Sequence, residues 1–457
     1  MRKGVSKKQR LASDNTRVVA FWALRRINGK DGFANLVLSD ALHHANLSPR
    51  DSAFVTNLVS TATRWKGTFD AVIEVAAQRN LAAIQPSLLD VLRLGVAQWW
   101  LEVPQHATVS ETVALAGSVI GERVVGITNA VLRRVTEKTS SQWLETLSSG
   151  LEPMAAKALR FAHPSWIVAA FAESLPDDEL EIALEANNVA PSVTLVARPG
   201  LITRDELIRE VGGVPTQYSP YGVHRCGNPA EVAAVRSSHA GVQDEGSQLV
   251  TLAAVRAADL YAATGAWLDM CAGPGGKAAL LAGLAQERNQ VLLANELQYH
   301  RAKLVAQTLH CYSNHLVIAA DARTTPWRDA AFALALLDAP CSGLGALRRR
   351  PDARWQRSPE QFNELNALQR ALLAAAVRAS APGGIIAWIT CSPHPSETVE
   401  IVQDGVSRYG LQILDAPALL PEVPNSAALS DLRFIQLWPH RHGTDAMFCA
   451  LLKVATP

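Results

Sequence analysis

The 457-residue sequence lacks a long uninterrupted apolar run, and no stretch approaches the ~18 residues that a membrane-spanning helix needs. Its first ten residues, MRKGVSKKQR, carry five Lys or Arg and contain no apolar segment of the kind found in secretory signals. We therefore expect a soluble, cytoplasmic protein without a membrane partner. Residues 1–15 are predicted to form a basic flexible tail. Its composition fits a solvated disordered segment and an arm that contacts RNA about equally well.

Charge of one sign and clustered cysteines are also missing. The formal net charge is only +1, so any binding to nucleic acid must use local basic patches. No two of the six cysteines lie closer than thirty residues, which excludes a Cys-x-x-Cys pair and predicts no metal site. Without a secretory signal a disulfide framework is not expected, so each thiol is either a small buried hydrophobe or a reactive group.

The apolar pattern divides the chain into regions of different texture. Apolar residues recur at helical spacing from about Thr16 to Glu145, so residues 16–148 are predicted to form an all-helical domain. Residues 149–240 are predicted to be a linker and a mixed α/β subdomain, with SVTLVARPG as one strand. In residues 241–457 short aliphatic runs alternate with helical segments, which is typical of a parallel, Rossmann-like sheet covered on both faces. RFIQLWP and MFCALLKV are placed to add an antiparallel pair at one edge.

A glycine-rich turn stands between the first strand and the first helix of this α/β region. WLDMCAGPGGKAALLAGLA contains Gly273-Pro274-Gly275-Gly276, where the backbone can approach a ligand and a helix N-terminus offers free N–H groups. Acids end the next strands: Glu296, about twenty residues on, then Asp321 and Asp338. Carboxyl ends of parallel strands share one cleft, so these residues predict a nucleoside-bearing cofactor. The alternative is a purely structural turn.

Two cysteines follow strands that end at the same predicted cleft. LLDAPCSGLG places Cys341 after the fourth strand, and WITCSPHPSE places Cys391 at the end of the fifth. Both could be buried spectators, because strands accept Cys well. A thiolate that adds to C6 of cytosine makes C5 able to accept a methyl group, and elimination then removes the C5 proton and expels the thiol. A pair of thiols in one cleft favours such covalent catalysis.

Several motifs together resemble those of one enzyme family. DMCAGPGGK, DAPCSGLGALRRRPDARW and ITCSPHPSE resemble the cofactor and two-cysteine motifs of the Sun-type (RsmB-like) RNA cytosine-C5 methyltransferases. AHPSW and GVQDEGSQLV resemble that family's linking motifs, and WPHRHGTDAMF resembles its C-terminal one. HATVSETVALAG and GITNAVLRRV are similar to the NusB-like RNA-binding domain fused to bacterial members. The resemblance covers nearly the whole chain.

The resemblance implies an activity, a cofactor and a substrate. It implies an S-adenosylmethionine-dependent methyltransferase that acts on C5 of a single-stranded or flipped cytosine in RNA, with 16S ribosomal RNA as the expected partner, and we expect a monomer. It implies that Cys391 attacks C6, that Cys341 assists product release, and that Asp338 hydrogen-bonds the cytosine edge. The implied cofactor-binding residues are Cys271, Ala272, Gly273, Pro274, Gly275, Gly276, Lys277, Glu296, Asp321 and Asp338. We read Lys277 as a site residue rather than as a solvated residue of the helix's first turn.

The chain departs from the family pattern at three places. Glu296 stands where an Asp is usual and can reach the same ribose diol. Glu397 is followed by Thr398 instead of Asn, which is expected to loosen a local hydrogen bond. Ala446 replaces a glycine in DAMF, so the local backbone is expected to differ.

A basic cluster follows the Cys341 loop. Arg348, Arg349 and Arg350 suit phosphate contacts, and Arg354 or Trp355 could support a splayed base; the alternative is a solvated turn with a buried Trp.

Three other functions compete with an RNA cytosine methyltransferase. A non-catalytic RNA-binding or assembly factor predicts degraded thiol and cofactor motifs, and both are intact. A DNA cytosine methyltransferase would use the Pro-Cys after the fourth strand and lack the second thiol. An adenine-N6 enzyme would carry Asn/Asp-Pro-Pro-aromatic in place of Asp338-Ala-Pro-Cys341. We therefore favour the RNA cytosine enzyme.

Overall fold

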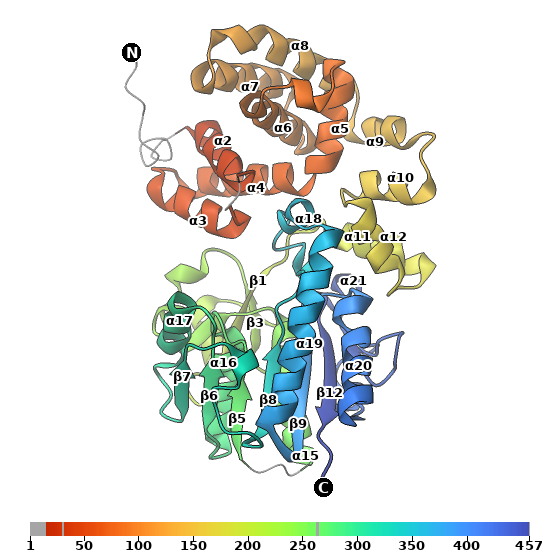
Figure 1. The fold of residues 1–457 in the computed structure, drawn as a ribbon. Helices are drawn as coiled ribbons and strands as arrows, with labels where there is room; N and C mark the ends of the chain where they lie inside the picture. The colour runs from red at the N-terminus through yellow and green to blue at the C-terminus, as the bar shows by residue number, and fades with distance from the viewer. Residues whose placement is uncertain (1–14, 30–31, 262–264, 457) are drawn as a thin grey trace. The chain divides into compact units, whose positions relative to one another are not determined.

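The computed structural model describes residues 15–29, 32–261 and 265–456 (Figure 1). The expected basic tail, 1–15, therefore lies outside the described residues except for Asn15. The chain divides into two compact units. The helical unit comprises residues 1–169 and 347–357, and the α/β unit comprises residues 170–346 and 358–457. The boundaries expected from the sequence, at residues 148 and 240, remain predictions.

The helical unit contains helices and no strand among its described residues, as the helical spacing predicts. The helix Pro49–Arg64 starts at a polar cap: the Ser48 side chain accepts from the N–H of Asp51, and Pro49 occupies the first turn, where its missing N–H costs nothing. The helices are α2 (Thr16–Ile27), α3 (Ala34–His44), α4 (Pro49–Arg64), α5 (Lys66–Ala77), α6 (Pro86–Trp100), α7 (Gln105–Val119), α8 (Val125–Val135), α9 (Ser140–Ser148), α10 (Pro153–Arg160) and α18 (Ala353–Gln356), while α11 (Ser165–Ala172) crosses the division between the units.

The segment 347–357 packs into the helical unit although its neighbours in sequence belong to the α/β unit. The indole N–H of Trp355 donates to the carbonyl of Thr63 (2.8 Å), and a β-carbon at Gly67 would lie 2.5 Å from the Trp355 ring. Arg354 is fully buried and donates to the carbonyl of Ala162 (2.9 Å). The prediction that Arg354 supports a splayed RNA base is therefore wrong, because its guanidinium lies in the protein interior. Trp355 is half-buried and anchors the segment instead.

The α/β unit begins with a small antiparallel sheet in the order β2-β3-β1-β4. Its central strand is the one predicted in SVTLVARPG. Helix α13 opens with a capping box between Thr203 and Glu206 and ends at Gly212, whose φ is +61°. The elements are α12 (Asp177–Ala186), β1 (Val193–Ala197), α13 (Arg204–Val211), β2 (Val214–Pro215), β3 (Gly222–Arg225), α14 (Ala233–Arg236) and β4 (Ala240–Val242).

A larger sheet follows, in the order β10-β12-β9-β8-β5-β6-β7 among the described residues. Strands β5 to β9 pair in parallel, and β12 pairs antiparallel with β9, β10 and β11. The predicted antiparallel pair, β11 and β12, is confirmed. The elements are α15 (Glu245–Leu260), β5 (Ala266–Asp269), α16 (Gly276–Glu287), β6 (Leu292–Asn295), α17 (Tyr299–Leu309), β7 (His315–Ile318), β8 (Phe332–Asp338), α19 (Phe362–Ala379), β9 (Ser380–Thr390), α20 (Val399–Tyr409), β10 (Gln412–Ile413), β11 (Ile435–Gln436), α21 (Pro439–His442) and β12 (Phe448–Lys453).

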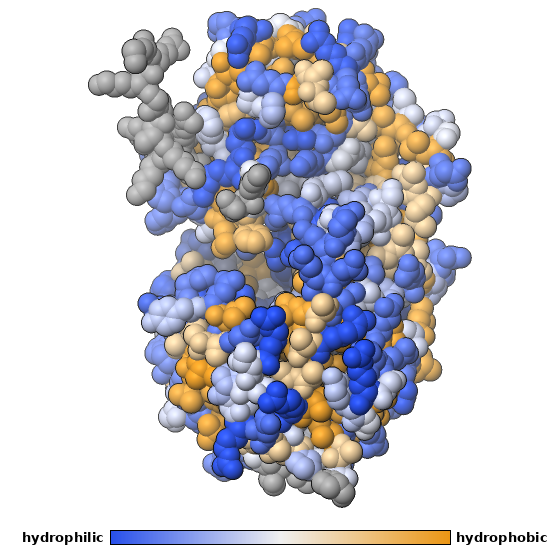
Figure 2. All heavy atoms as spheres, viewed as in Figure 1, coloured by the Kyte–Doolittle hydropathy of each residue, from blue (hydrophilic) through white to orange (hydrophobic). Residues whose placement is uncertain are grey.

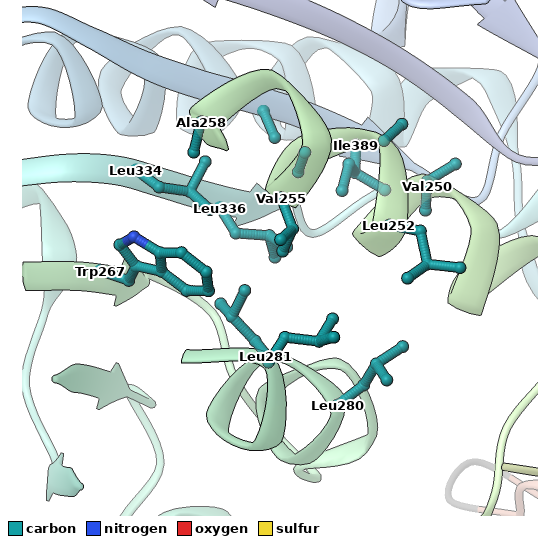
Figure 3. Close-up of a cluster of buried hydrophobic side chains, with 14 of the residues drawn as sticks. Val250, Leu252, Val255, Ala258, Trp267, Leu280, Leu281, Leu334, Leu336 and Ile389 are labelled. Atoms are coloured by element: carbon teal, nitrogen blue, oxygen red, sulfur yellow. The ribbon is translucent and has the colours of Figure 1, made fainter. Parts of the chain in front are cut away.

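Alternate residues of the central strands enter two separate cores, which makes the large sheet the middle of three layers. Leu334 and Leu336 of β8 pack with residues of α15 and α16, as Figure 3 shows around Trp267 and Leu281. The intervening residues of the same strands pack with α19 and α20 on the opposite face. Successive side chains of a strand point to opposite faces of the sheet, and both faces are covered by apolar helices. Most residues of the central strands are therefore buried, which explains the continuous aliphatic runs in the sequence.

The surface of the α/β unit is mixed. In the lower half of Figure 2 hydrophilic side chains separate small groups of apolar ones. Within residues 15–29, 32–261 and 265–456, no helix is long and apolar enough to cross a membrane.

Candidate active site

The parallel strands bring the predicted site residues to one edge of the sheet. Strand β5 lies between β6 and β8, and its last residue, Asp269, pairs with Leu336 of β8. Asp338 ends β8 and pairs with Ile389, which stands two residues before Cys391. The carboxyl ends of the strands therefore form one floor, where ligands bind in this class of fold.

The glycine loop closes against Glu296. The N–H of Gly273 donates to Glu296 Oε2 (3.1 Å), and Arg301 donates to the carbonyl of Gly273 (2.6 Å). A β-carbon at position 273 would lie 2.1 Å from the same Oε2 atom, so the contact requires glycine there. Gly275 adopts a φ of +114°, where a side chain is strained. The loop residues and Glu296 thus form a single structure.

The other predicted cofactor residues have mixed surroundings. Ala272 is buried, and its N–H donates to the carbonyl of Asn295 (2.8 Å) in β6. Burial raises the pKa of the neighbouring Cys271 thiol, which keeps it uncharged. Asp321 forms an ion pair with Arg323 (2.6 Å), and this pairing lowers the pKa of its carboxyl. Asp321 is thus held on the β7 side of the edge by its own local turn.

Lys277, in the first turn of α16, pairs with Asp338. The ammonium nitrogen lies 2.8 Å from Asp338 Oδ2. Burial by itself would lower the pKa of Lys277, but the Asp338 carboxylate outweighs it and raises the pKa. Lys277 is therefore a fixed cation at the strand ends, and not a solvated first-turn residue.

The two thiols touch each other. The Sγ atoms of Cys341 and Cys391 lie 3.4 Å apart, and both residues are half-buried. The hydrogen bond from Cys341 lowers the pKa of Cys391, with a further contribution from the Lys277 cation. The same hydrogen bond, together with burial, raises the pKa of Cys341. The pair thus favours a Cys391 thiolate that accepts a hydrogen bond from a Cys341 thiol.

Asp269 was missed in the sequence, although it precedes the predicted loop by a few residues. Its side chain is fully buried, and the N–H of Cys271 approaches it, but neither carboxyl oxygen makes a complete hydrogen bond with a described residue. Burial and the nearby Asp338 raise the pKa of Asp269 to about 8. A buried carboxyl of this kind is the natural partner of a bound cation. The only sequence signal was an acid at the end of a strand, shared with Glu296 and Asp338.

Comparisons with known proteins agree with this geometry. A family described as 16S rRNA methyltransferase RsmB/F matches residues 261–453, and the NusB family matches residues 14–137. A protein of Mycobacterium tuberculosis that is named as a putative methyltransferase is 44% identical, with 97% of each chain covered. Ribosomal RNA small subunit methyltransferase B of Pseudomonas putida is 30% identical, with 96% of this chain and 99% of that protein covered. The chain belongs to the RsmB/F family of rRNA methyltransferases.

The fold agrees with solved structures as well. A methyltransferase homologue from Pyrococcus horikoshii superposes with a TM-score of 0.53 at 20% identity, covering 66% of this chain and all of that one. The predicted fold, an all-α NusB-like domain followed by an α/β methyltransferase domain, is confirmed. S-adenosylmethionine is the cofactor of this methyltransferase, and RNA is its substrate class.

The residues at the strand ends of the methyltransferase fit this cofactor. S-adenosylmethionine carries a sulfonium and an ammonium, and Asp269 offers two buried oxygens that lack complete hydrogen bonds. The glycine loop leaves no side chain between the backbone and Glu296, whose carboxylate can bond a ribose diol. When bound, the cofactor supplies the methyl group.

The departures from the family pattern are accommodated locally. The hydroxyl of Thr398 donates to the carbonyl of His394 (2.9 Å), so this position keeps a side-chain hydrogen bond. Ala446 adopts no positive φ, and its N–H donates to the carbonyl of Gly345 (2.8 Å). An alanine therefore fits this backbone without strain.

Proposed function

We propose that this methyltransferase transfers a methyl group to C5 of a cytosine in 16S ribosomal RNA through a covalent bond between Cys391 Sγ and C6. The observation that supports the proposal is the 3.4 Å contact between two thiols at neighbouring strand ends. One thiol with a lowered pKa can act as the nucleophile, while a second beside it can exchange the proton.

The first step is the attack of the Cys391 thiolate on C6. The S–C6 bond forms, and the electron pair of the C5–C6 double bond moves to C5 and is delocalised through C4 onto N3, so that C5 becomes a nucleophile. The Lys277 cation, paired with Asp338 at 2.8 Å, can stabilise this negative charge, and the Asp338 carboxylate can accept a hydrogen bond from the exocyclic amino group of the base. C5 would then bond to the methyl group, the sulfonium S–CH3 bond would break, and the electron pair would return to sulfur, leaving the neutral thioether S-adenosylhomocysteine.

The second step is the release of the product, for which Cys341 is suited. The Cys391 thiolate is consumed when the adduct forms, so the hydrogen bond that raises the pKa of Cys341 disappears. Cys341 then loses its proton more readily and can remove the C5 proton. The C5–C6 double bond reforms, the S–C6 bond breaks, and Cys391 leaves as a thiolate.

The substrate details are part of the same proposal. A base that reaches both thiols must leave its stack, so we propose a single-stranded or flipped cytosine. The proposal assigns Glu296 and Asp321 to the ribose and base of the cofactor. A monomeric enzyme and a cytoplasmic location stay predictions.

The test is methyl transfer from labelled S-adenosylmethionine to small-subunit ribosomal RNA. Cys391→Ala is expected to abolish transfer, and Cys341→Ala is expected to accumulate a protein–RNA adduct that survives denaturing electrophoresis. Cys226→Ala, at an exposed thiol, is the matched control and should behave as wild type. Full transfer by Cys391→Ala would overturn the mechanism, and bisulfite mapping of the product would identify the base.

A further inference from the structure

A buried carboxylate, Glu397, connects the two loops that carry the thiols. Glu397 has no exposed surface and ends the short turn Pro395–Glu397 that follows Cys391. Its Oε1 accepts from the N–H of Ser342 (2.7 Å), the residue after Cys341, and its Oε2 accepts from the Ser342 hydroxyl (2.5 Å). The side chain therefore ties the Cys341 loop to the Cys391 loop.

Helix α19 completes the link on the other side of Cys341. The amide nitrogen of Gln369 donates both to the carbonyl of Pro340 (2.9 Å) and to Glu397 Oε1 (3.2 Å). The hydroxyl of Ser342 also lies 3.1 Å from that of Ser392, the residue after Cys391. The backbone on both sides of Cys341 is thus held by one carboxylate and one amide.

We propose that Glu397 is a positioning residue that fixes the Cys341 thiol beside the Cys391 sulfur. It acts through Ser342 and Gln369 and has no contact with substrate of its own. The inference rests on the proposed function, because it assigns a role in the same catalytic cycle. A buried carboxylate is costly unless several donors satisfy it, and here three do, which makes the link rigid.

The negative charge adds a second effect. The hydrogen bond with Cys391 and burial raise the pKa of Cys341, and the nearby charge of Glu397 raises it further. A neutral link of the same shape would hold the loops but would lose this influence on the proton. Charge and shape can therefore be tested separately.

The first experiment measures both thiols in the free protein. Glu397→Gln keeps the size of the side chain, and its amide can still accept from the Ser342 N–H and donate to the Ser342 hydroxyl. Alkylation by iodoacetamide is followed at each cysteine by mass spectrometry from pH 6 to 10. The curve of Cys341 alkylation rate against pH is expected to move to lower pH in Glu397→Gln. It should not move in Glu400→Gln, which changes an exposed carboxylate nearby. An unchanged Cys341 profile in Glu397→Gln would refute the charge effect, and the positioning role is tested separately by turnover.

The second experiment measures turnover. Glu397→Ala removes all three hydrogen bonds, and kcat is expected to fall about 100-fold because the Cys341 loop is no longer fixed. KM for RNA and the dissociation constant for the cofactor should stay within about threefold, and a stable protein–RNA adduct should accumulate as in Cys341→Ala. Wild-type kcat, or a loss confined to KM, would count against Glu397 as a positioning residue.

The two proposals fail in different ways. Transfer by Cys391→Ala would refute the covalent mechanism, whereas the alkylation profiles need no RNA and test Glu397 alone. If Glu397→Ala does not fold, Gln369→Leu, which removes the bonds to the Pro340 carbonyl and to Glu397 Oε1, replaces it in the turnover experiment; wild-type kcat in that variant would count against the positioning role.

Discussion

At the scale of single residues, Asp269 is the most unusual group of the site. It is fully buried, and its pKa is raised from 3.8 to about 8. The folded state therefore binds the proton more tightly than the unfolded state, so this carboxyl reduces the free energy of unfolding as the pH rises from about 4 to about 8. A buried carboxyl that lowers the stability of the fold near neutral pH is explained if it binds a ligand.

We expect Asp269→Asn to gain stability relative to wild type as the pH increases. The Asn side chain has no charge to bury, so the difference in free energy of unfolding should shift in favour of the variant by at least about 1 kcal/mol between pH 5 and pH 8. Urea unfolding at both pH values measures this difference. Asp329→Asn, at a mostly exposed carboxyl, is the control and should show no such shift. An equal difference at both pH values for Asp269→Asn would refute the assignment.

Lys277 supports a second prediction at this scale. The ammonium of Lys277 helps to lower the pKa of Cys391, after the hydrogen bond from Cys341. Lys277→Met should therefore raise the pKa of Cys391. Each pKa unit of increase lowers the thiolate fraction up to about tenfold, so alkylation of this thiol at pH 7 should slow by the same factor. Lys303→Met, at an exposed lysine in α17, is the control. Unchanged alkylation of Cys391 in Lys277→Met would contradict the prediction.

The sequence could predict where the candidate residues of local motifs lie in the fold. Cys341, Cys391 and Asp338 follow strands that are recognisable by their aliphatic runs, and parallel pairing brings their ends together. Asp269 and Glu397 could not be assigned in the same way. Their importance comes from complete burial and from partners more than fifty residues away, as with Glu397 and Ser342. Neither property is visible in the residues beside them.

At the scale of elements, the turn between β5 and α16 depends on particular glycines. A β-carbon at Gly273 would displace the Glu296 carboxylate, since it would lie 2.1 Å from Oε2, whereas at Gly276 the nearest atom beyond its own helix, in Gln243, would be 4.0 Å away. Gly273→Ala is expected to weaken cofactor binding at least tenfold, or about 1.4 kcal/mol. Gly126→Ala, in α8 of the helical unit, where a β-carbon would meet no atom within 4 Å, is the control and should bind as wild type. Calorimetric titration with S-adenosylmethionine measures both.

The elements themselves were largely predictable. The aliphatic runs identified the parallel strands because buried strands require apolar side chains on both faces. Sequence spacing could not give the order of strands in the sheet, since pairing depends on contacts that are distant along the chain. The antiparallel strand β12 pairs with β9 across more than fifty residues.

At the scale of the whole molecule, the prediction that Arg354 supports an RNA base is wrong, and the alternative of a buried Trp describes Trp355 better. Arg354 and Trp355 follow the Cys341 loop in sequence, but they pack with Ala162 and Thr63 of the helical unit. A basic and aromatic composition is compatible with both environments, so only the tertiary contacts distinguish them.

Trp355→Ala should destabilise the helical unit. It removes the hydrogen bond to Thr63 and leaves a space over Gly67, which is expected to cost about 2–4 kcal/mol for a half-buried Trp. Hydrogen exchange of amides in α4 and α5 should accelerate, while that of β8 and β9 should not. Glu364→Ala, at an exposed residue of α19, is the control. Unchanged exchange in α4 and α5 would show that the segment contributes no stability.

The membership of residues 347–357 in the helical unit has a consequence for biosynthesis. The ribosome completes residues 1–169 first, yet the last part of that unit emerges only after residues 170–346 have been made. At about 5–20 residues per second, the nascent helices wait roughly ten to forty seconds for Trp355 to arrive. The apolar surface around Gly67 is exposed during that interval, and chaperones that bind nascent chains should contact it until translation passes residue 357.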